Sequence, residues 1–206
     1  MRWLLVAVCM GVFVLPVYAA DPIAENVAKL GFTDKAQLLK IGEEVFNTDG
    51  ENTCLQCHGK GGTGGTQAGA ADLRHPKTWR VYQALGGDEA FNASKDKFRQ
   101  DMETVLHDLI RNGAPQWNLK FPSAHKEIKL DWSKVTIPDK ADKYNQMMKG
   151  ITSEPMEKKV KEVGEQLKKE GGKQLTPAQI RDLAAVSDFE YVKTLDDGSE
   201  NGGVFK

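Results

Sequence analysis

Apolar residues recur at helical spacing in three long stretches of this 206-residue chain. The first stretch follows Thr33-Asp34, a pair typical of a helix N-cap, and ends at Phe46. The second occupies 95–112, and the third follows Thr176-Pro177, where a capping box and a proline at the first position mark a helix start. No stretch shows the strict alternation of a β-strand. The pattern therefore predicts an all-α fold.

Between and beyond these stretches the pattern is weaker. A short helix is expected over 75–85, with Pro76 near its first position. A lysine- and glutamate-rich helix with a solvated face is expected over 157–169. Residues 114–155 carry scattered prolines and aromatic residues, and we expect a long loop and helix insertion there, before the last helix. The polar, glycine-rich residues 196–206 are expected to form a flexible tail.

The first twenty residues have the layout of a secretory signal peptide, with a positive charge at Arg2, an apolar core and small residues at the end. We expect cleavage after Ala19, with Ala20 as the near alternative, so that residues 1–19 are removed. The competing interpretation is a retained membrane anchor, since the apolar run reaches the lower limit of a spanning helix. A glycine and a proline interrupt that run, which favours a cleaved signal and a periplasmic protein.

The five residues Cys54-Leu55-Gln56-Cys57-His58 form a C-x-x-C-H motif, the attachment signature of a c-type haem. Two thiols add across the two vinyl groups of one haem, so both sulfurs must lie on one side of a single turn of chain. The histidine directly after the second cysteine then becomes the proximal ligand of the iron. The motif therefore predicts covalent attachment of one haem c at Cys54 and Cys57 and iron ligation by His58.

Three other uses of a C-x-x-C pair fit the sequence less well. A thioredoxin-like redox pair belongs to a βαβ pattern, and no strand pattern surrounds Cys54. A structural zinc site needs four ligands, and a disulfide across two intervening residues closes a small, strained loop. Cys9 lies in the expected signal peptide, so the exported chain would keep only Cys54 and Cys57. The covalent haem is then expected to stabilise the fold in place of a disulfide.

The charged residues give no sign of nucleic-acid binding, because 28 basic and 29 acidic residues leave a net charge of −1. Export and the haem motif support each other, since bacterial c-type haems are attached outside the cytoplasmic membrane. The partners expected for such a protein are periplasmic or membrane redox proteins, docked weakly over a small interface. No small-molecule substrate is expected.

Three parts of the chain resemble the class I (mitochondrial-type) cytochrome c family, in its bacterial periplasmic branch. Gly42 to Phe46 is similar to the N-terminal helix of the family, with its glycine and aromatic residue. Cys54 to Gly59 is the haem motif with its trailing glycine, and Leu175 to Leu195 is similar to the C-terminal helix. The resemblance implies a monohaem domain over 20–195, with a helical fold around one covalently bound haem c, low-spin iron and one-electron transfer.

The resemblance also implies a methionine as the distal iron ligand, in a loop before the last helix. The usual Met-Pro pair is missing from the corresponding stretch, residues 113–118. We favour Met148 and then Met147, which lie in a stretch that a glycine follows. The alternatives are His125, which would give bis-histidine ligation, and then Met156, His75, His107 or an open position.

The residues Arg74, Trp79 and Arg80 follow a glycine-rich loop and are candidates for binding the two haem propionates through guanidinium and indole N–H groups. The loop itself, residues 59–65, does not fit the pattern of a phosphate-binding loop. Glycines let a backbone lie close to a flat surface, and we expect this loop to lie against a haem edge.

Three functions are consistent with these features. The first is a periplasmic electron carrier that is not an enzyme, in which iron cycles between Fe(III) and Fe(II) and electrons pass through an exposed haem edge. The second is a haem c subunit of a larger periplasmic oxidoreductase, with the 114–155 insertion as the contact surface of a hetero-oligomer. The third is a haem enzyme or gas sensor, which ranks last because no acid–base residues converge on the expected iron site.

Overall fold

The computed structural model describes residues 21–50, 53–64, 70–112, 127–135, 161–162, 165, 174–199 and 203–205. Within these ranges the chain forms helices and connecting loops and no strand, so the prediction of an all-α fold is confirmed. The expected signal peptide over 1–19 and most of the 114–155 insertion lie outside the described residues. None of the described helices is long and apolar enough to cross a membrane.

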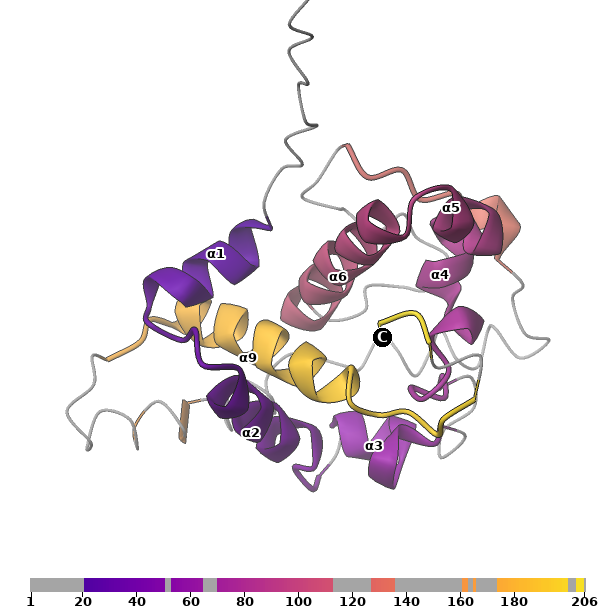
Figure 1. Ribbon diagram of the computed structural model, residues 1–206. Coiled ribbons are helices and arrows are strands. Elements are labelled where there is room, and N and C mark those ends of the chain that lie inside the picture. The colour runs from indigo at the N-terminus through magenta and orange to yellow at the C-terminus, as the bar shows by residue number, and fades with distance from the viewer. Residues whose placement is uncertain are drawn as a thin grey trace, which may run out of the picture.

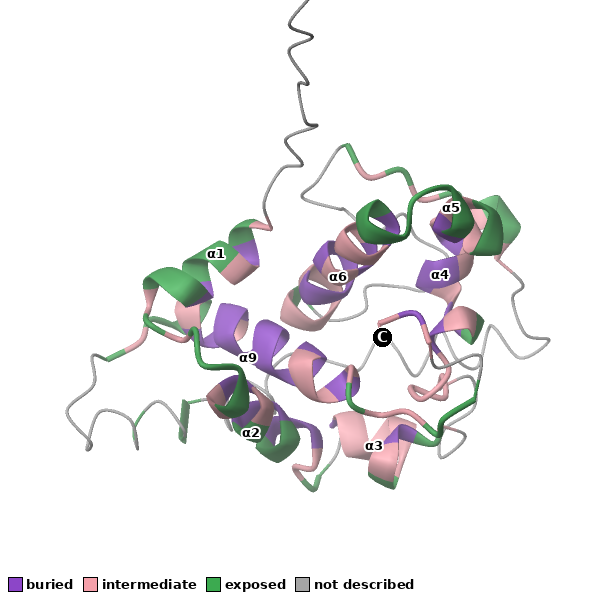
Figure 2. Ribbon diagram, viewed as in Figure 1, coloured by how far each residue is buried: buried purple, intermediate pink, exposed green. Residues whose placement is uncertain are grey.

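The last helix, α9 (Pro177–Val192), lies at the centre of the described structure (Figure 1). It packs against α2 (Lys35–Phe46), α6 (Lys95–Asn112) and α1 (Pro22–Lys29). Because helices cover it on several sides, α9 is buried over most of its length (Figure 2). The apolar stripe predicted for this helix is confirmed, and all its members are buried: Ile180, Leu183, Ala184, Val186, Phe189 and Val192.

The helix starts predicted from capping residues are confirmed in detail. At the start of α2, the Asp34 carboxylate accepts a hydrogen bond from the Ala36 N–H at 3.0 Å. At the start of α9, the Thr176 hydroxyl accepts from the Gln179 N–H at 3.3 Å, and the Gln179 side-chain carbonyl accepts from the Thr176 N–H at 2.8 Å. This reciprocal pair is the capping box that the sequence predicted.

The segment after the glycine-rich loop is more broken than the single helix expected over 75–85. It forms a 3₁₀ turn, η2 (Pro76–Thr78), and then α4 (Arg80–Ala84), because Trp79 between them is extended with ψ 144°. Gly86, at φ 111°, ends the helical run as expected, and a further helix, α5 (Gly87–Ala93), begins immediately after it. The predicted helix over 95–112 is confirmed as α6, which buries Phe98 and Met102.

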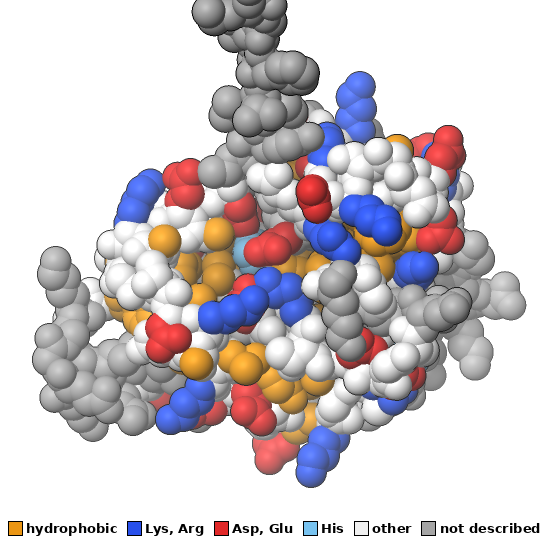
Figure 3. All heavy atoms as spheres, in the orientation of Figure 1, with side chains coloured by type: hydrophobic (Ala, Val, Ile, Leu, Met, Phe, Trp, Pro, Cys, Tyr) orange, Lys and Arg blue, Asp and Glu red, His pale blue; other side chains and the backbone are white. Residues whose placement is uncertain are grey.

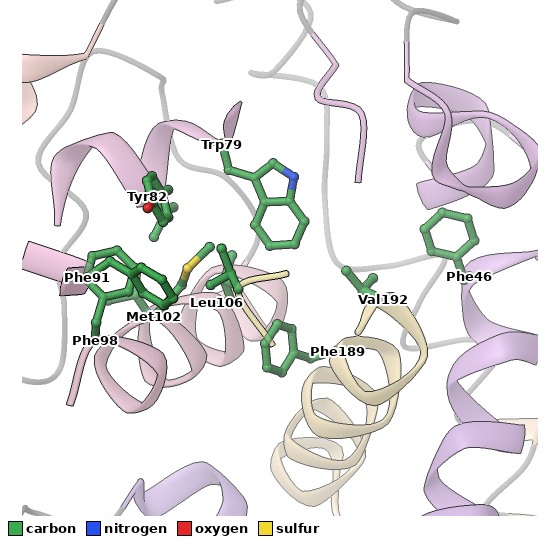
Figure 4. Close-up of a cluster of buried hydrophobic side chains, with 12 residues drawn as sticks. Phe46, Trp79, Tyr82, Phe91, Phe98, Met102, Leu106, Phe189 and Val192 are labelled. Atoms are coloured by element: carbon green, nitrogen blue, oxygen red, sulfur yellow. The ribbon is translucent and has the colours of Figure 1, made fainter. Parts of the chain in front are cut away.

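Two apolar clusters hold the helices together. The smaller cluster joins α1, α2 and the first half of α9, and it includes Ile23, Val27 and Leu183. The larger cluster joins α4, α5, α6 and the second half of α9. Figure 4 shows its two ends, with Phe91, Phe98, Tyr82 and Met102 gathered at one and Phe189 and Val192 of α9 toward the other.

The end of the chain differs from the flexible tail expected over 196–206. Val204 is fully buried, and its carbonyl accepts a hydrogen bond from the Arg99 Nε of α6 at 2.6 Å. The ring of Phe205 lies 5.9 Å from that of Trp79 and 5.4 Å from that of Phe189. Residues 203–205 are therefore packed onto the larger cluster, because two apolar side chains close to the terminus find buried partners there.

Candidate functional site

The C-x-x-C-H motif forms a single helical turn, α3 (Cys54–His58). The turn starts where the Thr53 hydroxyl accepts a hydrogen bond from the Gln56 N–H at 3.3 Å, and it ends at Gly59, whose φ of 73° favours glycine. Residues three apart on a helix share a face, so this turn places Cys54 and Cys57 on the same side. Both are free thiols, and both are half-buried.

The His58 ring is oriented by the backbone of the loop that follows it. Its Nδ1 lies 2.8 Å from the Ala71 carbonyl oxygen. A carbonyl can only accept, so Nδ1 carries the proton and the lone pair is on Nε2. Burial lowers the pKa of His58, and the hydrogen bond to Ala71 opposes that shift only in part. The ring is therefore a neutral imidazole with one nitrogen left to bind a metal, the form in which histidine ligates iron.

The glycine-rich loop brings Ala71 to this position. Beyond η1 (Lys60–Gly62), the Gly64 N–H donates to the His58 carbonyl at 2.7 Å, and the Leu73 N–H donates to the Gly62 carbonyl at 2.7 Å. Gly64 has φ 71°, and a Cβ there would lie 2.7 Å from the Asp72 nitrogen. Glycine is thus required for the backbone to turn back closely on itself, which places the carbonyl acceptor beside the imidazole. Contact between this loop and a haem edge stays a prediction.

An unexpected carboxylic acid lies beside the first cysteine. The Cys54 Sγ is 3.9 Å from the Asp188 Oδ1, and Asp188 is only 3% exposed on α9. Burial raises the pKa of Asp188 to about 7, an effect that the Cys54 hydrogen bond partly offsets. Burial and then the Asp188 charge raise the pKa of the Cys54 thiol. The sequence carried a signal for this site, because Ala184, Asp188 and Val192 share one helical face and the first and last are apolar.

Two of the predicted propionate donors, Arg74 and Trp79, already have a protein partner in Asp72, which follows Ala71. The Arg74 guanidinium binds the Asp72 carboxylate through both Nε (3.0 Å) and an NH group (2.7 Å), and it lowers the pKa of that carboxyl. The buried Trp79 Nε1 donates to the Asp72 backbone carbonyl at 2.9 Å. Arg80 is half-buried at the first position of α4. Contact with haem propionates stays a prediction, and for Arg74 and Trp79 it requires an exchange of partners.

The candidates for the distal ligand are placed only in part. Met148, Met147, Met156 and His125 lie outside the described residues. His75 is near the surface, where its Nε2 lies 3.1 Å from the Asp197 carboxylate.

His107, the other described candidate for the distal position, is fully buried on α6. Its Nδ1 lies 2.5 Å from the Asp21 carboxylate, and its ring meets the Phe189 ring edge to face at 5.2 Å. Within the described part of the chain, the His107 Nε2 has no hydrogen-bond partner. Of the two described histidine candidates, His107 is therefore the one with a buried ring nitrogen left over.

Apart from the Asp188 carboxyl, the residues that adjoin the motif include several apolar side chains. Cys54, Ala71 and Leu73 pack against the larger cluster, which includes Phe46 and Val192. Among the described residues, no three His, Cys, Asp or Glu side chains are grouped as they would be around a metal ion. The motif thus presents two thiols and one imidazole beside a hydrophobic core, the donor set that covalent attachment of a haem would use.

No protein-family model matches this chain, and neither the curated proteins nor the solved structures contain a match.

Proposed function

We propose that this protein is an exported monohaem c-type cytochrome that carries single electrons between periplasmic or membrane redox proteins. The observation that carries the proposal is the 2.8 Å contact between the His58 Nδ1 and the Ala71 carbonyl. It fixes the tautomer of a histidine that directly follows two cysteines on the same helical turn.

The residues of the site have distinct roles in this proposal. Cys54 and Cys57 form the two thioether links, and the helical turn α3 places both residues on one side. His58 ligates through Nε2, while the Ala71 carbonyl orients the ring and increases its basicity. The adjoining apolar cluster excludes water, and a dry environment stabilises the less charged form of the site. When bound, haem c supplies the Fe(III)/Fe(II) couple.

The remaining assignments belong to the same proposal. Met148 is our first choice for the distal position, followed by Met147, His125 and Met156. A thioether at this position raises the reduction potential, and a second imidazole lowers it. Arg74, Trp79 and Arg80 are proposed to bind the propionates.

The test is the optical spectrum of the full chain, matured in a bacterial periplasm with a cytochrome c assembly system. We expect a low-spin spectrum and a reversible one-electron titration. A weak far-red charge-transfer band would identify a methionine ligand, and substitution of Met148 or Met147 would then abolish it. Loss of all haem from a Cys54→Ala/Cys57→Ala variant serves as the control. A high-spin ferric spectrum would contradict a simple electron carrier.

A further inference from the structure

The carboxyl group of Asp188 lies where α9 meets the haem-binding turn α3. It is 3% exposed, and Cys54 is the one hydrogen-bond partner that the described part of the chain provides. In the proposed cytochrome the Cys54 sulfur becomes a thioether, which has no proton to donate. Haem attachment would therefore remove this hydrogen bond and leave a buried acid beside the cofactor. Buried carboxyl groups are usually paired, because an isolated buried charge is costly.

A second aspartate on the same helix shows the usual arrangement. Asp182 is also 3% exposed, but it forms an ion pair with the Arg111 guanidinium and accepts a hydrogen bond from the Asn26 side chain at 3.2 Å. The two acids thus lie on the same helix and are equally buried, but their charges are not compensated in the same way. Asp182 has the contacts of a structural ion pair, whereas Asp188 has no described cation beside it.

The elements packed around Asp188 bring few other ionisable groups close to it. From α3 these are Cys54 and, beside it, Cys57. From α2, the residue in contact is Gly42, whose backbone packs directly against the Ser187–Asp188 backbone and which has no ionisable side chain. From α6, His107 meets the neighbouring Phe189 and pairs with Asp21.

The next charged residues along the chain after Asp188 are Glu190 on α9 and Lys193 at its C-cap, which pair with each other. Lys193 also lies near Glu103 of α6, and Glu190 near Lys35 of α2.

We propose that Asp188 is the proton-coupled residue of this cytochrome, taking up a proton when the haem is reduced and releasing it on oxidation. This inference rests on the proposed function. One electron arrives from a partner redox protein, and one proton arrives from bulk water and binds the Asp188 carboxylate. The net charge of the buried site is then the same in both redox states, which avoids the cost of adding an uncompensated charge to an apolar interior.

Burial raises the pKa of this carboxyl to about 7 while Cys54 still donates to it, and loss of that hydrogen bond removes an effect that lowers the pKa. A ferric haem carries one more positive charge than a ferrous haem, so it favours the carboxylate, and reduction favours the acid. The reduction potential therefore falls as the pH rises through the neutral range. At the limit of full coupling, the equilibrium constant for reduction changes tenfold per pH unit.

The test compares the reduction potential of the holoprotein at pH 5.5 to 8.5 in the wild type and in Asp188→Asn. We expect the wild-type potential to fall across this range and the Asp188→Asn potential to stay nearly level and higher at pH 8.5. Asp188→Glu should restore the slope. Asp182→Asn is the matched control and should keep the wild-type slope; Glu190→Gln replaces it if Asp182→Asn does not fold.

Redox-difference infrared spectra provide a second measurement that does not depend on electron-transfer activity. The C=O stretch of a protonated carboxyl should appear on reduction of the wild type and be absent from Asp188→Asn. Equal slopes in the wild type and Asp188→Asn, with no such band, would overturn the role of Asp188 while leaving the cytochrome intact. Absence of haem from the wild-type protein would instead overturn the proposed function, so the two failures are distinguishable.

Discussion

The Asp188 carboxyl and the His58 imidazole are both buried, and burial favours the neutral form of each. It raises the pKa of the acid and lowers that of the base. For His58 this secures an unprotonated Nε2 at neutral pH, which iron ligation requires. For Asp188 it produces an acid whose protonation changes within the neutral range. The same physical cause thus leaves His58 with an unprotonated ring nitrogen and gives Asp188 a pKa near neutral pH.

The raised pKa of Asp188 also predicts a dependence of stability on pH. An unfolded aspartate titrates near pH 4, while folded Asp188 titrates at about 7. Between these values the folded protein binds the extra proton, so the free energy of unfolding falls as the pH rises from about 4 to about 7. We expect Asp188→Asn to lack this decline and to be more stable than the wild type at pH 8, by roughly 1–3 kcal/mol.

Urea unfolding of both holoproteins at pH 5 and pH 8 measures this difference. Asp49→Asn, which changes an exposed aspartate, is the control and should follow the wild type. Stability curves for the wild type and Asp188→Asn that stay parallel over this interval would show that Asp188 titrates outside it.

At the level of the helices, the crossing of α2 and α9 depends on one glycine. A Cβ on Gly42 would lie 1.8 Å from the Ser187 carbonyl oxygen, which belongs to the backbone of a buried helix. Gly42→Ala should therefore push the helices apart and destabilise the protein by about 3 kcal/mol. Chemical denaturation measures the loss, and Lys40→Ala on the exposed face of α2 is the control. A stable Gly42→Ala protein would contradict this packing.

The end of the chain should contribute to stability through Val204. Its side chain is fully buried against the cluster that includes Trp79 and Phe189. Val204→Ala should cost about 2 kcal/mol of unfolding free energy, since it removes buried methyl groups and leaves a cavity. Val135→Ala, at a half-exposed position, should cost less than half as much in the same thermal or chemical unfolding experiment. Equal losses of unfolding free energy in the two variants would contradict the burial of Val204 described here.

The elements that sequence could predict are those whose signals are local. The N-caps at Asp34 and Thr176 and the apolar faces of α2, α6 and α9 were enough to place these helices. The helix α1 and the packed residues 203–205 were missed. Their apolar side chains are few, and they are ordered by distant partners rather than by neighbours in the sequence.

The candidate site likewise combines residues that local sequence predicts and residues that only tertiary contacts bring together. Cys54, Cys57 and His58 could be predicted as a site because the motif depends only on spacing along five residues, and haem binding there stays a prediction. Ala71 contributes a backbone carbonyl, which no residue type reveals, and Asp188 reaches Cys54 across 134 positions of sequence. The Ala71 contact depends on the loop that folds back after α3, and the Asp188 contact depends on the packing of α9 beside α3. Neither contact can be predicted without the tertiary structure.

At the scale of the whole molecule, the charge distribution fits weak and reversible docking. The net charge is −1, and Figure 3 shows lysines, arginines and carboxylates interspersed over one face of the molecule. Interspersed charges give no strong field to hold a partner, which agrees with the proposed carrier, since a carrier must leave its partner after each electron. The helices in turn cover a buried core against which the motif packs, so the proposed redox site would lie at the edge of that core.

The mass of the purified, denatured protein tests the central claim most directly. After maturation in a periplasm that assembles c-type cytochromes, we predict the mass of residues 20–206 plus one haem, with no thiol left to alkylate. Denaturation releases a haem that is merely bound, so only covalent attachment at Cys54 and Cys57 preserves this mass. A chain that carries no haem and has two thiols open to alkylation would contradict the account.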